Sequence, residues 1–191
     1  MLIKIERTPN PATLKFIVNK KWLEVIWECK NDEDAKKSII ANQLMKVEGV
    51  VYLFFGYDFV SVSKEKEANW EILKPIILGE ISDFLLEEIP FFQTTQIKDQ
   101  ESKPNPSASA KKEEELTEVE KKIIEVLNEK VQPAIESHGG AIQFYKLENG
   151  IVYLDLQGAC KGCPSSTITL KNGIENLLKY YFPEITSVES I

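Results

Sequence analysis

Residues 142–156 are Ile-Gln-Phe-Tyr-Lys-Leu-Glu-Asn-Gly-Ile-Val-Tyr-Leu-Asp-Leu, and this stretch predicts a β-hairpin. Apolar residues in 142–147 predict the first strand, and residues 151–156 predict the returning strand. Asn149-Gly150 between them is the strongest short signal for a hairpin turn, because both residue types accept positive φ angles. The C-terminal part of the chain is therefore expected to form around an antiparallel strand pair.

An amphipathic helix is predicted before the hairpin. Thr117 and Glu120 have the spacing of a capping box, which marks its start. Gly139-Gly140 marks its end, because glycine supplies the left-handed conformation that stops a helix. Between these signals one apolar stripe keeps helical spacing. It consists of Val119, Ile123, Val126, Leu127, Val131 and Ile135.

A second helix and a last strand are predicted after the hairpin. Pro164 favours the first position of a helix, and the apolar residues from Ile168 to Leu178 follow at helical spacing. Ile185 to Val188 has the pattern of a final edge strand. The predicted order is α-β-β-α, with a terminal β-strand.

The motif Cys160-Lys161-Gly162-Cys163-Pro164-Ser165-Ser166 joins the hairpin to the second helix and holds two of the three cysteines. Two close thiolates bind an iron–sulfur cluster, zinc or copper(I), or they cycle between dithiol and disulfide. Cys163 is expected at a helix N-terminus, where the helix dipole favours the thiolate. Lys161 adds positive charge between the two sulfur atoms.

The number of ligands restricts what this pair can do. A structural zinc site needs four ligands, and so does a four-iron cluster held by one thiolate per iron. One chain offers two here, because Cys29 is far away in sequence and the sole histidine, His138, has the position of a helix-ending residue. Either the pair does redox chemistry alone or a second copy completes the site. Redox chemistry by the pair alone would make the protein a dithiol oxidoreductase, which is the alternative function. A thioredoxin-like enzyme, however, places its motif in a β-α-β unit and not after a hairpin.

A linker divides the chain. Residues 98–115 contain no large apolar residue, so they cannot bury enough surface to offset the entropy of ordering them. We therefore expect two small α+β domains, residues 1–97 and residues 116–191, joined by a flexible linker at 98–115. This layout lets the two domains move independently.

The N-terminal domain shows strand and helix patterns but no cluster of metal-binding or catalytic residues. By elimination this domain is expected to recognise other proteins. The predicted strands are 2–6, 14–18, 22–29, 50–55 and 59–63, and the predicted helices begin at Asp32 and Trp70. The aromatic residues weighed as a partner-binding surface, and expected to be mostly core, are Trp22, Trp27, Phe54, Phe55, Tyr57, Phe59 and Trp70.

Composition excludes several classes of protein. The 191 residues carry a net charge of -7 with no basic patch, which argues against nucleic-acid binding. No apolar run is long enough for a membrane span. The strand-like residues 1–6 predict that there is no signal peptide, and three cysteines favour a reducing compartment over a secreted disulfide framework.

With these residues in view, the C-terminal domain resembles the NifU-like, or Nfu-type, iron–sulfur cluster carriers. The N-terminal domain resembles the N-terminal domain of Nfu proteins from mitochondria and related bacteria. The C-terminal resemblance rests on 131–134, Gly139-Gly140, 150–152, 156–160, 163–166, 169–171 and Gly173-Ile174. The N-terminal resemblance rests on Thr8-Pro9-Asn10-Pro11, 14–16, 54–56, Asp58-Phe59 and 73–75. His138 and Ala141 stand where the family usually has acidic residues.

The resemblance implies a scaffold or carrier and not an enzyme. Cys160 and Cys163 of two chains would hold one [4Fe–4S] cluster in a homodimer, and a [2Fe–2S] cluster would use the same four thiolates. An upstream assembly scaffold would donate the cluster, and apo iron–sulfur proteins would receive it. Neither nucleic acid nor membrane is an expected partner. The expected location is the cytoplasm of a bacterium, or the mitochondrial matrix if the chain is a mature organellar form.

Overall fold

The computed structural model describes residues 3–87, 89–92, 116–161 and 164–191. The chain separates into two compact units, Met1–Asn105 and Pro106–Ile191. Both units combine helices with a β-sheet, so the predicted α+β class is confirmed. The predicted linker, residues 98–115, lies outside the described residues, and the predicted domain boundaries stay predictions.

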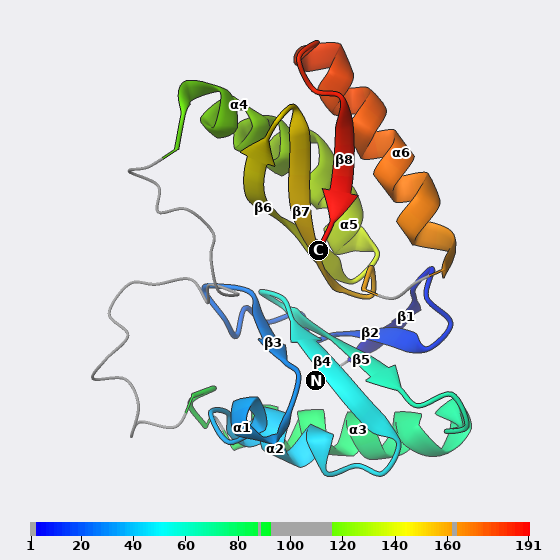
Figure 1. Ribbon diagram of the computed structural model, residues 1–191. Coiled ribbons are helices and arrows are strands. Elements are labelled where there is room, and N and C mark those ends of the chain that lie inside the picture. The colour runs from blue at the N-terminus through cyan, green and yellow to red at the C-terminus, as the bar shows by residue number, and fades with distance from the viewer. Residues whose placement is uncertain (1–2, 88, 93–115, 162–163) are drawn as a thin grey trace. The chain divides into compact units, whose positions relative to one another are not determined.

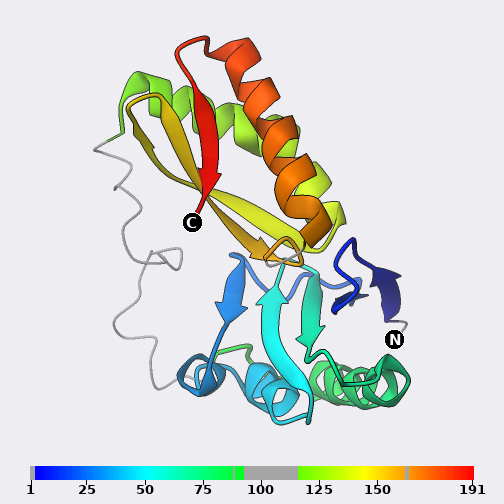
Figure 2. The same cartoon turned by 45° about the vertical axis from the view of Figure 1, so that its right-hand side comes forward.

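The first unit is a sheet covered by helices on one face (Figures 1 and 2). The described strands form a five-stranded antiparallel sheet in the order β1-β2-β5-β4-β3. Alternate strand residues face the helices and build the core. The strands are β1 (Lys4–Arg7), β2 (Thr13–Ile17), β3 (Trp27–Cys29), β4 (Val50–Phe55) and β5 (Phe59–Lys64). The helices are α1 (Asp32–Ala35), α2 (Ile39–Met45) and α3 (Trp70–Leu86).

The predicted strand over residues 22–29 forms only at its end, as β3. The backbone N–H and the indole N–H of Trp22 donate to the carbonyl oxygens of Tyr57 and Gly56, both at 2.9 Å. These bonds hold Trp22 against the turn between β4 and β5, so its segment does not join the ladder of the sheet.

The helical pattern that begins at Asp32 forms two helices and not one. Ser38 interrupts it, since its backbone has extended angles and its hydroxyl accepts a hydrogen bond from the N–H of Ala41 at 3.5 Å. Ser38 is fully buried and pairs with Phe92 in an isolated β-bridge. This contact comes from a segment distant in sequence, so helical spacing alone could not predict the break.

The second unit has the predicted order α-β-β-α-β (Figure 1). Its described strands are β6 (Gly140–Glu148), β7 (Ile151–Gly158) and β8 (Ser187–Ser190), in the spatial order β6-β7-β8. β7 pairs antiparallel with β6 and parallel with β8. The helices are α4 (Glu118–Val126), α5 (Gln132–Ser137) and α6 (Pro164–Tyr181), on one face of the sheet (Figure 2).

The local signals of the second unit are confirmed. Thr117 and Glu120 form the capping box at the start of α4. Asn149 and Gly150 have φ angles of 50° and 76° and make the hairpin turn. His138 caps the C-terminal end of α5, followed by Gly139 with a φ of 79°.

The predicted first helix of this unit contains a π-helical segment, Leu127–Val131, between α4 and α5. Pro133 explains it, because proline has no N–H and its ring would collide with the carbonyl group of Glu129 in a regular α-helix. The apolar stripe remains continuous, and Ile123, Leu127 and Val131 are all buried in the core.

None of the helices in the described part of the chain is long and apolar enough to cross a bilayer.

Candidate functional site

The two cysteines of the motif follow the end of β7. Cys160 lies in the turn after Gly158, with 5% of its surface exposed, and packs into the core of the second unit. Cys163 lies outside the described residues; the next residue in the chain, Pro164, is the first of α6. The structure thus places one predicted ligand and the helix that follows the other.

Three glycines surround Cys160. Gly139 and Gly158 have φ angles of 79° and 67°, a left-handed conformation that other residues rarely adopt. Gly140 pairs with Gly158 across β6 and β7. These positions let the end of α5, the start of β6 and the end of β7 approach one another around the cysteine turn.

Gly140 makes the closest approach to the sulfur atom. A β-carbon at this position would lie 2.6 Å from the carbonyl oxygen of Gln157 and 3.0 Å from the Sγ atom of Cys160. Even alanine would therefore collide with the turn. Sequence reasoning identified Gly139-Gly140 as a helix end and as part of the family pattern, but it did not predict this contact with the cysteine.

Backbone hydrogen bonds fix the turn. The N–H of Ala159 donates to the carbonyl oxygen of Gly139 at 3.1 Å, and the N–H of Lys161 donates to that of Gly158 at 3.0 Å. The first bond joins the turn to the end of α5. Lys161, the next residue of the turn, is exposed, and its role as a positive charge beside the sulfur atoms stays a prediction.

Gln132 is a positioning residue that the sequence did not single out. Its Oε1 atom accepts from the backbone N–H of Ile142 at 3.1 Å, and its Nε2 atom donates to Glu136 at 2.8 Å. The first bond joins α5 to β6 close to Gly140. Gln132 stands just after the π-helical segment, which sets the direction of α5.

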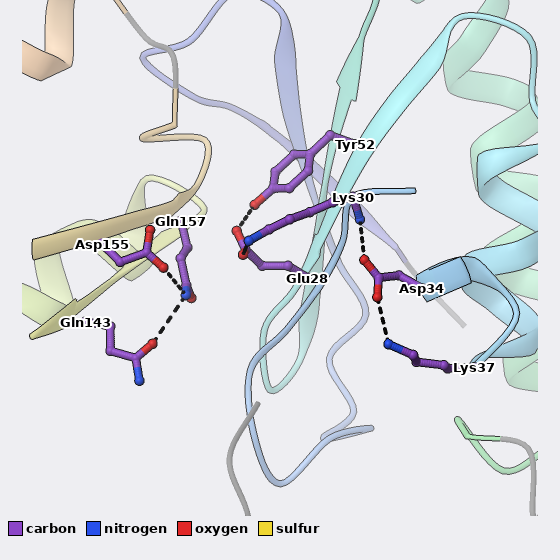
Figure 3. Close-up of polar contacts among 8 residues, drawn as sticks. All are labelled: Glu28, Lys30, Asp34, Lys37, Tyr52, Gln143, Asp155 and Gln157. Carbon is purple, nitrogen blue, oxygen red and sulfur yellow. Dashed lines mark hydrogen bonds and ion pairs between the residues drawn. The ribbon is translucent and has the colours of Figure 1, made fainter. Parts of the chain in front are cut away.

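A buried polar group lies on the sheet just before the turn (Figure 3). The Nε2 atom of Gln157 donates to Asp155 at 3.0 Å along β7 and to Gln143 on β6 at 3.5 Å. Asp155 and Gln157 are 7% and 6% exposed. These bonds link the two strands of the hairpin at the end that leads into Cys160.

The remaining cysteine and the histidine lie in other elements than the cysteine turn. Cys29 lies in β3 of the first unit, fully buried, and burial raises the pKa of its thiol to about 12. A thiol with so high a pKa is a poor thiolate ligand. His138 is exposed and ends α5. His138 therefore has the helix-ending position that its sequence context predicts.

The described residues hold no group of three or more histidine, cysteine, aspartate or glutamate side chains arranged around one metal position.

The first unit has its own polar contacts (Figure 3). Glu28 is buried in β3, where it accepts a hydrogen bond from the hydroxyl group of Tyr52 and pairs with Lys30 at 2.5 Å. Asp34 accepts from the backbone N–H of Lys30 at 3.2 Å and pairs with Lys37 at 2.8 Å. These contacts join β3 to β4 and to α1.

Comparison with known proteins supports the two-part reading of the sequence. Residues 3–88 match the model of the N-terminal domain of the scaffold protein Nfu/NifU, and residues 123–189 match the NifU-like domain. The human protein named NFU1 iron-sulfur cluster scaffold homolog, mitochondrial, is 41% identical over 193 residues, which cover all of this chain and 72% of that protein. The relative of the same name from Drosophila persimilis is 37% identical, and the chain covers 65% of its length.

Two solved structures are similar to single parts of the chain. The solution structure of a NifU-like protein from Saccharomyces cerevisiae is 26% identical, with a TM-score of 0.45, over 49% of this chain and 86% of that one. The crystal structure of a Staphylococcus aureus protein is 32% identical, with a TM-score of 0.37, over 42% of this chain and 99% of that one. By its two domain matches and its identity to the human relative, the chain belongs to the family of Nfu-type iron–sulfur cluster scaffold proteins.

Proposed function

We propose that two copies of this protein hold one iron–sulfur cluster through Cys160 and Cys163 and pass it to apo-proteins. The observation that carries the proposal is the turn at Cys160, which three glycines and two backbone hydrogen bonds form around one sulfur atom. Such a turn holds Cys160 in a defined position at the end of β7, directly before the segment that leads to Cys163 and α6.

The ligand number supports a site shared between copies. Each chain supplies two thiolates at the motif, whereas a [4Fe–4S] cluster takes four. Within the described part of the chain, no three histidine, cysteine, aspartate or glutamate side chains gather around one metal position. A two-fold dimer doubles the pair and completes the set. We therefore propose a [4Fe–4S] cluster bridging a homodimer; a [2Fe–2S] cluster has the same ligand requirement.

The burial of Cys160 has a consequence for loading and release. Cys160 is only 5% exposed, so we propose that the turn opens when a cluster binds. Reversal of the same movement withdraws a ligand from the cluster. Transfer is then an exchange of thiolates, in which a recipient's cysteines replace Cys160 and Cys163 one at a time. No bond-making residue beyond these ligands is required, and we therefore propose a carrier and not an enzyme.

The dithiol oxidoreductase alternative gains no support. The motif follows the β6–β7 hairpin, whereas thioredoxin-like enzymes place it in a β-α-β unit. The relatives are named as cluster scaffolds. Because those relatives are also named as mitochondrial, we propose the mitochondrial matrix as the site of action, in place of a bacterial cytoplasm. The partners would be an upstream scaffold as donor and apo iron–sulfur proteins as recipients.

Anaerobic reconstitution of the full chain tests the proposal. We expect about four irons per dimer, a [4Fe–4S] Mössbauer signature and a monomer-to-dimer shift in sedimentation on loading. Cys160→Ser and Cys163→Ser should each abolish the cluster, and the control Cys29→Ser should retain it. The loaded protein should activate an apo-enzyme that needs a [4Fe–4S] cluster. A fully loaded monomer, or metal-free reduction of insulin disulfides at catalytic rates without cluster transfer, would refute the shared-site carrier.

A further inference from the structure

The first unit contains a pocket that the cluster site does not use. Its volume is 590 Å³, within the usual range for ligand-binding pockets. One wall is the segment that connects β1 to β2, with Pro9 and Pro11, and the other is the beginning of α3, with Trp70 and Lys74. Arg7 lies at the end of β1 on its border. We call this cavity the Arg7 pocket.

The walls of the Arg7 pocket are held in place by hydrogen bonds. The hydroxyl group of Thr8 shares its single hydrogen between the carbonyl oxygens of Asn10 and Thr13, each 2.9 Å away. The indole N–H of Trp70 donates to the carbonyl oxygen of Pro11 at 3.2 Å and joins the two walls. A site that is ordered before binding loses less entropy when a ligand enters.

Arg7 is the sole arginine of the sequence, and among the residues that the structure describes it forms no ion pair. The neighbouring cation, Lys74, is already paired with Glu71 at 2.8 Å. Arg7 lies on the same face of β1 as Ile5, which packs against the core, so its guanidinium group and the apolar wall border the same cavity. A guanidinium group matches a carboxylate with two parallel hydrogen bonds.

Strand β1, which borders the pocket, indicates that the ligand is an extended peptide. Among the described strands β1 pairs only with β2, so its outer edge keeps unpaired backbone groups. An extended peptide can add to such an edge, and every second side chain then faces the same side. Glu71 in the wall repels a polyanion, and its hydrogen bond from Lys74 lowers its pKa and keeps it ionised.

We propose that the Arg7 pocket binds an extended acidic peptide segment of a partner protein, with a carboxylate on Arg7 and an apolar side chain, two residues away, against Trp70. The first unit thereby recruits partners without using the cysteine motif. Peptide binding is measured on the cluster-free chain. If no peptide binds, the proposed cluster site is unaffected, and if no cluster binds, the proposed peptide site is unaffected.

The experiment uses the full chain labelled with ¹⁵N and two capped probe peptides, acetyl-Asp-Thr-Phe-Thr-amide and acetyl-Asn-Thr-Phe-Thr-amide. Trp70→Phe assigns the indole signal of Trp70 among the three tryptophans. We expect the aspartate peptide to shift this signal and the amide signal of Thr8, and to bind at least about tenfold more tightly than the asparagine peptide.

Variants identify the group responsible. Arg7→Gln should abolish the preference for aspartate. Arg7→Lys should keep part of it, because lysine retains the positive charge but cannot make two parallel hydrogen bonds to a carboxylate. Lys4→Gln is the matched control: it removes a cation from the same strand outside the pocket and should keep the full preference. Equal binding of both peptides, or a preference that survives Arg7→Gln, would overturn the proposal. So would inorganic phosphate that produces the same shifts at similar concentration, since it would assign the pocket to small anions.

Discussion

At the scale of single residues, Gly140 gives the sharpest test of the cysteine turn. A methyl group there would meet a backbone carbonyl oxygen at 2.6 Å and the sulfur atom of Cys160 at 3.0 Å. We expect Gly140→Ala to lower the free energy of unfolding of its unit by about 1–3 kcal/mol, as overpacked sites do, and to reduce the iron bound after reconstitution. Urea unfolding, monitored by circular dichroism, measures the change in stability, and iron analysis after reconstitution measures the change in cluster binding.

Gly173→Ala is the matched control. Gly173 lies within α6, and a β-carbon there has no neighbour within 4 Å. Alanine favours a helix interior over glycine, so this change should stabilise the protein by about 0.5–1 kcal/mol and leave iron binding unchanged. If both substitutions reduced the bound iron alike, the contact between Gly140 and Cys160 would not be the cause.

Cys29 provides a test that depends on pH. Burial raises its pKa from an ordinary value of 9.0 to about 12, so the folded state holds the thiol proton more tightly than the unfolded state. The stability that this provides is complete below about pH 9 and is lost as the pH rises toward 12, at up to about 1.4 kcal/mol per pH unit. Unfolding free energies measured from pH 8 to pH 11 should fall less steeply in Cys29→Ala.

A thiol reagent checks the same burial independently. The double variant Cys160→Ser/Cys163→Ser leaves Cys29 as the sole thiol of the chain. It should react slowly with an aromatic disulfide reagent at pH 8 while folded and completely in guanidinium chloride. Rapid reaction of the folded protein would contradict both the burial and the raised pKa.

At the scale of secondary-structure elements, the start of α4 depends on the capping box. The backbone N–H of Thr117 donates to Glu120 at 2.8 Å, and the N–H of Glu120 donates to the hydroxyl group of Thr117 at 3.2 Å. Thr117→Ala should cost about 1 kcal/mol, and Thr117→Ser, which keeps the hydroxyl group, much less. Hydrogen exchange at the amides of β7, the central strand of that sheet, measures the difference; equal protection in the two variants would show that the cap contributes nothing.

The elements also show which features a sequence can predict. The turn at Asn149-Gly150, the capping box and the glycine stop after α5 depend on neighbouring residues, and each was predicted correctly. The break at Ser38 and the position of Trp22 depend on partners distant in sequence, Phe92 and Gly56, and neither was predicted. Periodicity carries no information about such contacts.

The same division applies to the site. The role of Cys160 as a ligand stays a prediction from its local motif, whereas the helix after Cys163 begins where proline indicated. The contact of Gly140 with Cys160 and the bond from Ile142 to Gln132 join segments that are 20 and 10 residues apart. The first depends on the pairing of β6 with the end of β7, and the second on the packing of α5 against β6, so neither can be predicted from local sequence.

At the scale of the whole molecule, the two units are expected to unfold independently. All three tryptophans, Trp22, Trp27 and Trp70, belong to the first unit, whereas the second unit has none. Tryptophan fluorescence therefore reports the unfolding of the first unit alone, and circular dichroism reports both. If the stability of one unit does not depend on the other, Gly140→Ala should shift the circular dichroism transition in urea without moving the fluorescence transition.

A substitution in the first unit completes this comparison. Leu53 is fully buried in β4, and Leu53→Ala should lower the stability of that unit by about 2–5 kcal/mol and move the fluorescence transition. Hydrogen exchange at β7 and the iron bound after reconstitution should not change, because Cys160 and its glycines belong to the second unit. If either substitution moved both transitions together, the chain would unfold as one cooperative body. Partner binding at the Arg7 pocket and cluster binding at Cys160 would then be energetically coupled, and not the separate properties of two units.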